Sequence, residues 1–419
     1  IDALGRLIDA RLDQLDARLT QGGEPTFVSI DDMDAPEWTT EALGPHKRER
    51  AEVLVRRLKQ RFAPGALLHT AQGKWYPGEP LPRWALGIFW RKDGVPIWRD
   101  DRLLAAAYWN YGHTEDDARR FAETLARHLG LATRYVIPAY EDALHHLRQE
   151  AELPANLDLA RADLKDDLER RRLANALSRG LDTPTGYVLP LGWNWQSGCW
   201  YSAPWPMRRE RLYLSPGDSP VGLRLPLQSL PWVGEDEAEY VGEVDPFAPQ
   251  APLADFHGEV AARYSHFDRI DEAHPEIHPQ TLPSTPGGGA GGPGANTIQV
   301  AVPHIAISFE ARGGCLHVFL PPTHRLEQAL DLIAAVERTA ATLNLPVAVE
   351  GYAPPSDGRL EKLLVTPDPG VIEVNIHPSR NWDELVARTT ALYEEARLSR
   401  LGTEKFMLDG RHTGTGGGN

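Results

Sequence analysis

The spacing of hydrophobic and polar residues divides the chain into helical and strand-like segments. In residues 41–62, the apolar side chains of Leu54, Leu58 and Phe62 recur at helical spacing, which predicts a helix with one apolar face. Composition and spacing predict further helices at residues 1–20, 103–112, 115–131, 140–150, 157–180, 324–345 and 382–401.

Strand-like runs occupy the intervals between these helices. Runs near residues 66–70 and 84–90 flank a loop of Gly, Pro, Lys and Trp, and residues 347–352 form another run. Residues 186–232 contain short apolar runs among Trp and Pro, which predicts irregular strands around a cleft. Because strands arrive as hairpins with helices between them, we expect an α+β fold with a mainly antiparallel sheet and flanking helices.

A Gly-Gly pair joins the two alternating runs of residues 300–322. A two-residue Gly-Gly turn is a strong hairpin signal. In that register Arg312 pairs with Cys315, and Glu310 faces His317 with the two Cβ atoms about 5 Å apart. Glu310 and His317 are therefore candidate metal ligands, with an ordinary cross-strand surface pair as the alternative interpretation.

A second hairpin is predicted at residues 359–378, with its turn at the sequence Pro-Asp-Pro-Gly. In its second strand, Glu373, Asn375 and His377 recur at a spacing of two, which places all three on one face. Oxygen ligands with one imidazole suit Mg²⁺ or Mn²⁺ better than a structural Zn²⁺. The alternative interpretation is an ordinary strand whose polar face meets water.

The first strand of this hairpin carries Arg359, a candidate catalytic residue, and Glu361, a candidate metal ligand. A four-residue loop would place Glu361 on the opposite side from Glu373. A five-residue loop would pair Glu361 with His377. The sequence leaves both registers open.

Residues 22–32 read GGEPTFVSIDD and place Glu24 between two glycines and a strand-like run. Glycines allow close backbone approach, and the carboxylate of Glu24, followed by acceptors at Ser29, Asp31 and Asp32, has the composition of a cation site. A solvated turn is the alternative interpretation.

Basic and glycine-rich positions have the composition of anion sites. Lys74, with Arg83 nearby, could meet a nucleotide phosphate, and Arg224 could meet a substrate carboxylate. The segment HTGTGGGN contains Gly416 and Gly417, whose backbone N–H groups can approach phosphates, although no GK[ST] sequence of a Walker loop follows. The alternatives are exposed cations without a specific role and a disordered tail.

Composition narrows the class of protein. The 419-residue chain has a net charge of −15, which argues against nonspecific binding to nucleic acid. Its two cysteines give no disulfide framework and fit a reducing cytoplasm. No apolar run approaches the ~18 residues of a membrane span, so we expect neither a membrane nor a nucleic-acid partner.

The length of the chain predicts two lobes or one large domain with insertions. We interpret residues 1–20 as an N-terminal helix from a longer chain and residues 21–280 as the first part of the main domain. Residues 281–296 are rich in Gly and Pro and form a linker or long loop. Residues 297–419 then form the second part.

Five long stretches carry a resemblance to one family: GGEPTFVSIDD, GKWYPGEPLPRWALG, PGDSPVGLRLPLQSLPW, RLEKLLVTPDPGVIEVNIHPSRNW and RHTGTGGGN. Almost the whole chain resembles the amidoligase region of bacterial transglutaminase-like proteins, a proposed carboxylate–amine ligase of the glutamine-synthetase-like superfamily. The resemblance implies a glutamine-synthetase-like catalytic sheet that binds ATP and Mg²⁺. It also implies that a carboxylate is activated as an acyl phosphate before an amine attacks it.

By motif, the resemblance makes Glu24 an early metal-binding glutamate and places Glu373 and Asn375 on a late ligand strand, so Glu24 and Glu373 are also candidate catalytic residues. The implied partners are a peptide or amino-acid carboxylate, an amine, and a transglutaminase-like domain in the same full-length chain. Phosphoryl transfer needs charge neutralisation more than a strong nucleophile, and these acids and cations supply it. Two other functions remain open: a non-catalytic peptide-binding module that serves a transglutaminase-like domain, and a metal-dependent peptide hydrolase.

Overall fold

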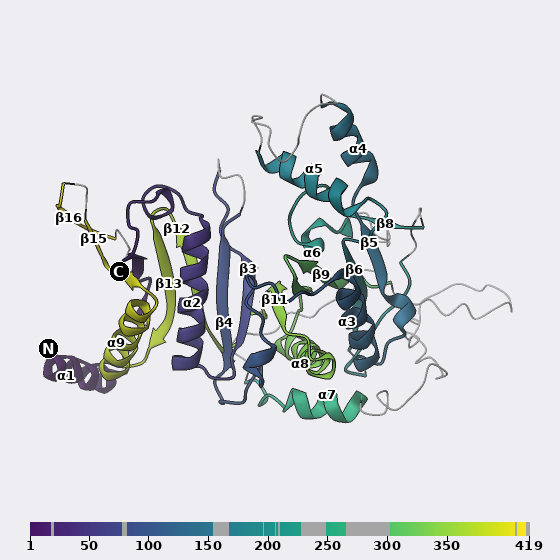
Figure 1. The fold of residues 1–419 in the computed structure, drawn as a ribbon. Helices are drawn as coiled ribbons and strands as arrows, with labels where there is room; N and C mark the ends of the chain where they lie inside the picture. The colour runs from purple at the N-terminus through teal and green to yellow at the C-terminus, as the bar shows by residue number, and fades with distance from the viewer. Residues whose placement is uncertain are drawn as a thin grey trace, which may run out of the picture. The chain divides into compact units, whose positions relative to one another are not determined.

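A computed structural model gives the fold (Figure 1). It describes residues 1–17, 21–77, 82–153, 167–195, 197–205, 207, 210–227, 249–264, 302–406 and 409–415. The chain forms two compact units. Unit 1 comprises Ile1–Tyr108 and Ser356–Asn419, and unit 2 comprises Trp109–Pro355. In sequence, unit 2 is therefore inserted between the two segments of unit 1.

Unit 1 contains strands in the order β14-β2-β13-β12-β4-β3, with β1 also beside β13, and every pairing among them is antiparallel. The strands are β1 (Gln21–Gly23), β2 (Thr26–Ser29), β3 (Leu67–Gln72), β4 (Trp84–Arg91), β12 (Leu360–Asp368), β13 (Val371–Ser379) and β14 (Leu401–Gly402), with β15 (Glu404–Phe406) and β16 (His412–Gly414) as a separate pair. The helices are α1 (Asp2–Gln14), α2 (Pro45–Phe62) and α9 (Trp382–Leu398), with short 3-10 helices η1 (Pro36–Trp38) and η2 (Asp101–Leu103).

Helix α2 covers one face of this sheet, as the sequence pattern predicts. Its Leu54 and Leu58 are fully buried, and so are Ile88 of β4 and Leu363 of β12. Each such side chain contributes about 1.5–3 kcal/mol when removed from water. The proline at the first position of α2 suits a helix start, because its missing N–H would have no partner there.

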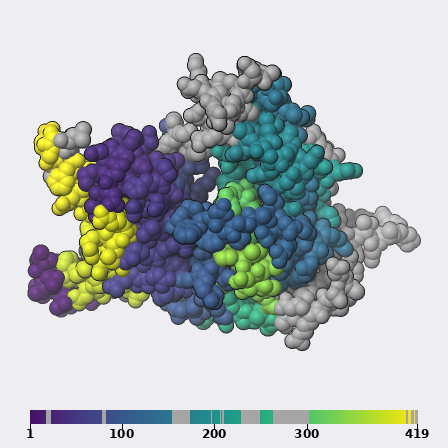
Figure 2. Space-filling model, viewed as in Figure 1, coloured from purple at the N-terminus to yellow at the C-terminus, as the bar shows by residue number. Residues whose placement is uncertain are grey.

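Helix α9 covers the same face and links the two ends of the chain. The ring of Tyr393 packs on Phe27 of β2 with 5.5 Å between ring centroids. Helix α1 packs on α9 where Gly5 leaves room for the indole of Trp382, since a Cβ on Gly5 would lie 2.3 Å from that ring. Purple N-terminal and yellow C-terminal atoms are accordingly adjacent within unit 1 in Figure 2.

The opposite face of the unit 1 sheet is more open. The side chains on this face include Lys362, Leu364 and Thr366 of β12, and none of them is buried. Their neighbours Leu363 and Val365, which point toward the helices, are fully buried. We call the first surface the open face.

Unit 2 contains strands in the order β11-β10-β9-β6-β5-β8, with β7 beside β6. The β10–β11 and β5–β8 pairs are parallel, and the other pairs are antiparallel. The strands are β5 (Ile137–Tyr140), β6 (Gly186–Asn194), β7 (Cys199–Tyr201), β8 (Leu212–Tyr213), β9 (Ile305–Arg312), β10 (Cys315–Leu320) and β11 (Val347–Gly351). The helices are α3 (Glu115–His128), α4 (Ala143–Ala151), α5 (Asp167–Arg179), α6 (Val221–Arg224), α7 (Phe256–Tyr264) and α8 (Leu326–Leu343), with the 3-10 helix η3 (Thr133–Tyr135).

The two faces of the unit 2 sheet carry different layers. Helix α3 packs on one face, where the rings of Phe121 and Phe309 lie 5.7 Å apart. Val221 of the short helix α6 belongs to an apolar cluster on the other face that includes Val188 and Ala306.

The predicted α+β class is confirmed, with a mixed rather than purely antiparallel set of strands. The Gly-Gly hairpin is confirmed to the residue, because Arg312 pairs with Cys315 and Glu310 with His317. Gly313 and Gly314 have φ angles of 57° and 76°, which favour glycine.

The predicted helix at 103–112 is wrong. The 3-10 helix η2 ends at Leu103, and Arg56 donates hydrogen bonds to the carbonyls of Leu104 and Ala105 at 3.4 and 2.7 Å. In a helix, these carbonyls would instead accept hydrogen bonds from main-chain N–H groups.

The predicted linker at 281–296 lies outside the described residues, so the predicted domain boundary stays a prediction. Both cysteines are free. Among the helices in the described ranges, none is long and apolar enough to cross a bilayer.

Candidate functional site

The β12–β13 hairpin has a defined register. Thr366 lies opposite Glu373, and Leu364 lies opposite Asn375. Only Pro369 and Gly370 separate the strands, so the turn is shorter than either loop considered from the sequence. Gly370 makes this possible with a φ of 76°, and its N–H donates to the carbonyl of Glu41 at 3.2 Å.

Distant parts of unit 1 meet on the open face around Glu373. Thr26 of β2 lies directly opposite Glu373 of β13. The Thr26 hydroxyl is hydrogen-bonded to that of Thr415 at 2.6 Å. On the other side, the amide nitrogen of Asn375 donates to the hydroxyl of Thr366 at 3.3 Å. None of these hydrogen bonds involves the Glu373 carboxylate.

The Glu373 carboxylate is half-buried and makes no hydrogen bond or ion pair with any residue in the described ranges. Burial raises the pKa of Glu373 above its ordinary value, and the carboxylates of Asp368 and Glu24 raise it further. The cations Lys74 and Arg83 partly oppose this effect. The open face therefore gathers three carboxylates and two cations, and among these acids Glu373 is the half-buried one without a partner in the described ranges.

The other members of this cluster differ in how firmly they are held. Arg83 is buried, forms an ion pair with Asp368, and stacks its guanidinium 4.3 Å from the ring centroid of Tyr76. Lys74 and Glu24 are exposed, and neither makes a hydrogen bond or ion pair within the described part of the chain. The cluster thus combines a fixed ion pair with an acid and an ammonium that are free to meet a ligand.

His377 does not share the face of Glu373 and Asn375, and this prediction is wrong. Its ring packs on Phe62 of α2 and Trp90 of β4, with centroid distances of 6.2 and 4.9 Å, on the side covered by helices. The register of β13 against β1 shifts between Ile376 and Ser379, and this irregularity breaks the alternation on which the prediction depended. Burial lowers the pKa of His377 to about 4, which suits a neutral packed ring.

Arg359 and Glu361 also lie away from the cluster. Glu361 is opposite Trp90 of β4 and so points to the same helix-covered side. Arg359 precedes β12 and is held by Asp357, with Nε and Nη2 donating at 3.0 and 2.7 Å. The observed register is neither of the two left open by the sequence, but like the four-residue loop it places Glu361 on the opposite side from Glu373, and Arg359 stabilises the loop before β12.

Three acceptors that follow Glu24 in the sequence serve the local turn instead. Ser29 accepts hydrogen bonds from the N–H groups of Asp31 and Asp32, both at 3.2 Å. Asp31 is paired with Arg400 at 3.0 Å and with Arg50 at 3.4 Å. These acceptors are therefore engaged in hydrogen bonds and ion pairs within the chain, and Ser29 is fully buried. Gly416 and Gly417 lie outside the described residues, and Thr415 is the last described position before them.

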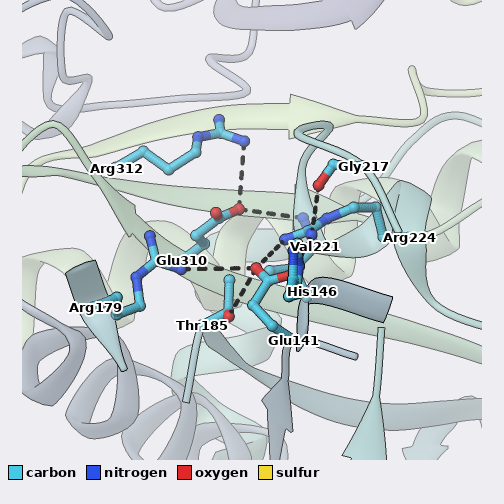
Figure 3. A network of polar contacts seen from close by, with 9 residues as sticks. All are labelled: Glu141, His146, Arg179, Thr185, Gly217, Val221, Arg224, Glu310 and Arg312. Atoms are coloured by element: carbon cyan, nitrogen blue, oxygen red, sulfur yellow. Dashed lines mark hydrogen bonds and ion pairs between the residues drawn. The ribbon is translucent and has the colours of Figure 1, made fainter. Parts of the chain in front are cut away.

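Unit 2 pairs Glu310 with His317 in the predicted register. Glu310 belongs to a network of polar contacts within the chain (Figure 3). Glu310 accepts from the N–H of Val221 at 3.1 Å and from Arg312 at 3.4 Å. Arg312 also donates to Glu350 at 2.5 Å. The Nδ1 of His317 contacts the carbonyl of Cys315 at 3.0 Å. The guanidinium of Arg312 therefore lies between the carboxylates of Glu310 and Glu350, at the place where the sequence predicted a metal ion.

Arg224 is committed to a carboxylate of the chain itself. Its Nη1 and Nη2 donate to Glu141 at 2.8 and 3.0 Å, and Glu141 also contacts His146 at 3.2 Å and accepts from Thr185 at 3.1 Å (Figure 3). Burial alone would raise the pKa of Glu141, but its hydrogen bonds to His146 and Arg224 outweigh burial and lower it to about 2. The carboxylate that we expected from a substrate is therefore supplied by Glu141.

Sequence reasoning missed several residues of these networks. Asp368 was assigned to turn chemistry, because Asp beside Pro and Gly is typical of turns. Glu141 follows a short strand with no motif around it, and Thr415 was passed over for the glycines after it. Lys47 is a fully buried lysine inside an amphipathic helix, and helical spacing gives no signal for such a residue.

The donor set around Glu373 fits Mg²⁺ in one specific way. In the ranges that the structure describes, no three His, Cys, Asp or Glu side chains are close enough to hold a metal ion by themselves. Mg²⁺ usually keeps several waters and binds through one or two carboxylates together with phosphates, so it does not need such a cage. The residues that would hold it are Glu24, Glu373 and Asn375, which offer only oxygen to a hard cation, whereas the Asp368 carboxylate is committed to Arg83.

Comparison with known proteins gives one match. The whole chain, residues 1–419, matches the family described as "Putative amidoligase enzyme (DUF2126)". No curated protein and no solved structure matches the chain. Because the match extends over every residue, the chain belongs to this amidoligase family.

Proposed function

We propose that the protein is an ATP- and Mg²⁺-dependent carboxylate–amine ligase that acts through an acyl phosphate, with its metal and phosphate site on the open face of unit 1. The observation that carries this proposal is the Glu373 carboxylate, which is half-buried, lacks a partner in the described ranges and lies beside Glu24 and Asp368. The family assignment supports a ligase in general. The nucleotide, the metal and the acyl phosphate are our own inference.

The electrostatics of the cluster favour a bound cation. An ionised Glu373 with two other carboxylates nearby is unfavourable until positive charge is added. Lys74 and Arg83 oppose this repulsion only in part, since the pKa of Glu373 is still raised. A divalent cation bound through Glu373 would relieve the repulsion and leave coordination positions for phosphate oxygens.

Each residue of the cluster has a distinct task in this proposal. Lys74 carries an ammonium that is free to meet a phosphate, whereas Arg83 is held by Asp368 and balances the charge of that carboxylate. Asn375 is oriented by Thr366, which leaves its amide oxygen available as a ligand. When bound, ATP would supply the phosphoryl group that turns the substrate carboxylate into an acyl phosphate. Fixed charges of this kind are the main protein contribution to phosphoryl transfer.

The substrates in this proposal are a peptide or amino-acid carboxylate and an amine. A transglutaminase-like domain in the same full-length chain is the partner we propose from the resemblance alone. The test measures ADP release by the wild type with Mg²⁺, ATP, a panel of carboxylates and a panel of amines. We expect release that needs both substrates and falls at least about 100-fold in Glu373→Ala, a loss typical of a group that stabilises the transition state.

The matched control is Glu361→Ala, which removes a carboxylate from the same hairpin but on the helix-covered side. Its rate should stay near that of the wild type. Peptide hydrolysis without nucleotide would favour a metal-dependent hydrolase. Peptide binding that persists without ATP or metal, in the absence of turnover, would favour the binding module.

A further inference from the structure

Lys47 is buried on the side of the unit 1 sheet that α2 covers, and its ammonium is enclosed by the main chain. The side chain has no exposed surface. Its Nζ donates to the carbonyls of Glu41 at 3.0 Å, Ala42 at 3.1 Å and Asp368 at 2.9 Å. Three N–H donors thus meet three acceptors, and the acceptors come from a loop and from the end of β12.

A charged ammonium is unusual at a fully buried position such as that of Lys47. Removing a charge from water is costly, and apolar residues of similar volume often replace buried charges without loss of stability. Among the side chains, however, the lysine ammonium is the compact group that points three donors from one atom. The ammonium can bind all three carbonyls at once, but a buried charge is a poor choice for stability alone.

The loop that contains Glu41 and Ala42 makes further contacts with the turn of the β12–β13 hairpin. The N–H of Gly370 donates to the carbonyl of Glu41 at 3.2 Å. A Cβ on Gly370 would lie 2.9 Å from the carbonyl oxygen of Thr39, so the loop and the turn are in close contact. Lys405 donates to the carbonyl of Trp38 at 2.6 Å and fixes the loop from the other side. Lys47 is the contact that joins this loop directly to Asp368.

Asp368 connects this buried contact to the open face. Its main-chain carbonyl binds Lys47, while its side chain holds Arg83 and raises the pKa of Glu373. A shift of Asp368 would therefore move the guanidinium and change the field at Glu373 together. We propose that Lys47 is a positioning residue that fixes the end of the β12–β13 hairpin and, through Asp368, sets the charges around Glu373.

This inference rests on the proposed function only for its effect on catalysis. The inference that Lys47 fixes the end of the β12–β13 hairpin can be tested without measuring turnover. The first measurement is hydrogen exchange of peptides that span the 366–373 turn, in the wild type and in Lys47→Met, which keeps the aliphatic stem. Lys92→Met is the matched control, because Lys92 is an exposed lysine of unit 1 outside this contact.

We expect Lys47→Met to speed exchange in the turn by about tenfold or more, since three hydrogen bonds from a charged donor are lost. Peptides from β9 and β10 of unit 2 should exchange at the wild-type rate, and Lys92→Met should match the wild type throughout. Unchanged exchange at the turn would overturn the inference. If Lys47→Met does not fold, the pH dependence of hydrogen exchange in the wild type tests the inference instead. Burial lowers the pKa of the Lys47 amine to about 8, so its proton can be removed by raising the pH.

For the wild type we compare pH 7 with pH 9, after correction for intrinsic exchange. The surroundings of the Lys47 amine include Glu37, Asp368, Arg83 and Lys405, and burial is the main cause of its lowered pKa. Loss of its proton should loosen the turn selectively at pH 9. Equal protection at both pH values would contradict the inference.

The predicted effect of Lys47 on catalysis is tested by the pH dependence of ADP release. The wild type should lose activity above about pH 8, and Lys47→Met should be slower by about tenfold at pH 7 without that alkaline loss. If the wild type has no nucleotide-dependent activity, the proposed function fails while exchange still decides the role of Lys47. If Glu373→Ala is inactive but Lys47→Met keeps the wild-type rate and pH profile, the positioning role is wrong and the proposed function stands.

Discussion

Thr26 and Glu373 lie directly opposite each other on neighbouring antiparallel strands, although 346 positions separate them in the sequence. The hydroxyl of Thr26 is hydrogen-bonded in turn to that of Thr415. Because Glu24 precedes β2, and Asp368 lies in the same β12–β13 hairpin as Glu373, the beginning and the end of the chain build one charged surface. The proposed site depends on this convergence.

Replacing Glu373 by Gln should stabilise the protein in the absence of metal. A raised pKa means that the folded state favours the protonated form, so stability from this group is present at low pH and is lost as pH rises from 4.5 through the folded pKa. At pH 7 the ionised group is therefore a net cost, which Gln removes. We expect a melting temperature about 1–3 °C above that of the wild type in EDTA.

At pH 4, where the carboxyl is largely protonated in both states, the difference between Glu373→Gln and the wild type should nearly vanish. Thermal melts of both proteins at pH 4 and pH 7 test this, with Glu361→Gln as the control for loss of a nearby charge. A lower melting temperature for Glu373→Gln at pH 7 would show that the carboxylate has a partner that stabilises it.

Removing the charge of Glu141 should destabilise unit 2 strongly. Glu141→Gln leaves Arg224 buried with no carboxylate, a situation that typically costs about 3–5 kcal/mol in the free energy of unfolding. The double variant Glu141→Gln/Arg224→Met removes both charges and should recover most of this loss. Urea unfolding at pH 7 measures the losses in Glu141→Gln, in Arg224→Met and in the double variant, and additive losses would mean that the two side chains are not coupled.

The same ion pair predicts a pH dependence. The pKa of Glu141 is lowered from 4.5 to about 2, so its contribution is fully present above pH 4.5 and is lost as the pH falls toward 2. The stability difference between the wild type and Glu141→Gln should be constant above pH 5 and shrink in more acidic solution. A difference that stays constant down to pH 2.5 would indicate that the carboxylate is not the group that titrates.

Changing His377 to Leu should leave ADP release and its proposed dependence on Mg²⁺ unchanged. The imidazole packs between Phe62 and Trp90 on the helix-covered side, and Leu preserves much of that volume. The measurement is the rate of ADP release as a function of Mg²⁺ concentration. A rise in the Mg²⁺ concentration needed for half-maximal rate would restore His377 as a ligand.

Gly370 should tolerate no side chain, for two separable reasons. Its φ of 76° is strained for other residues, and a Cβ would crowd the carbonyl of Thr39. Gly94 has a similar φ of 79° but no atom within 4 Å of its virtual Cβ. Gly94→Ala should therefore cost about 1 kcal/mol of unfolding free energy from backbone strain alone. Gly370→Ala should cost more, and equal losses would mean that the contact with Thr39 is easily relaxed.

Local sequence patterns predicted the elements whose structure is set by local chemistry. The Gly-Gly turn fixed the pairing of Glu310 with His317, since two glycines with positive φ permit only a short turn. Amphipathic spacing located α2, α8 and α9 close to their observed bounds. The approach of Glu24 to Glu373 followed from family resemblance, because no local pattern relates residues so far apart.

The failures have non-local causes. His377 left the expected face because pairing with β1 disturbs the alternation of β13, and a spacing of two cannot report a third strand. Arg224 was expected to bind a substrate, but Glu141 is more than 80 positions away and no motif connects them. Lys47 and Asp368 were missed because their roles depend on main-chain carbonyls, which the sequence does not distinguish.

The central claim is that Glu373 belongs to a site for Mg²⁺ and a triphosphate, and the most direct measurement is calorimetric binding of a non-hydrolysable ATP analogue with and without Mg²⁺. The wild type and Glu361→Ala should bind the analogue in a Mg²⁺-dependent manner, and Glu373→Ala should bind it at least about tenfold more weakly because it loses a charged ligand of the cation. Binding by Glu373→Ala that equals the wild type, or no Mg²⁺-dependent binding by the wild type, would contradict the account.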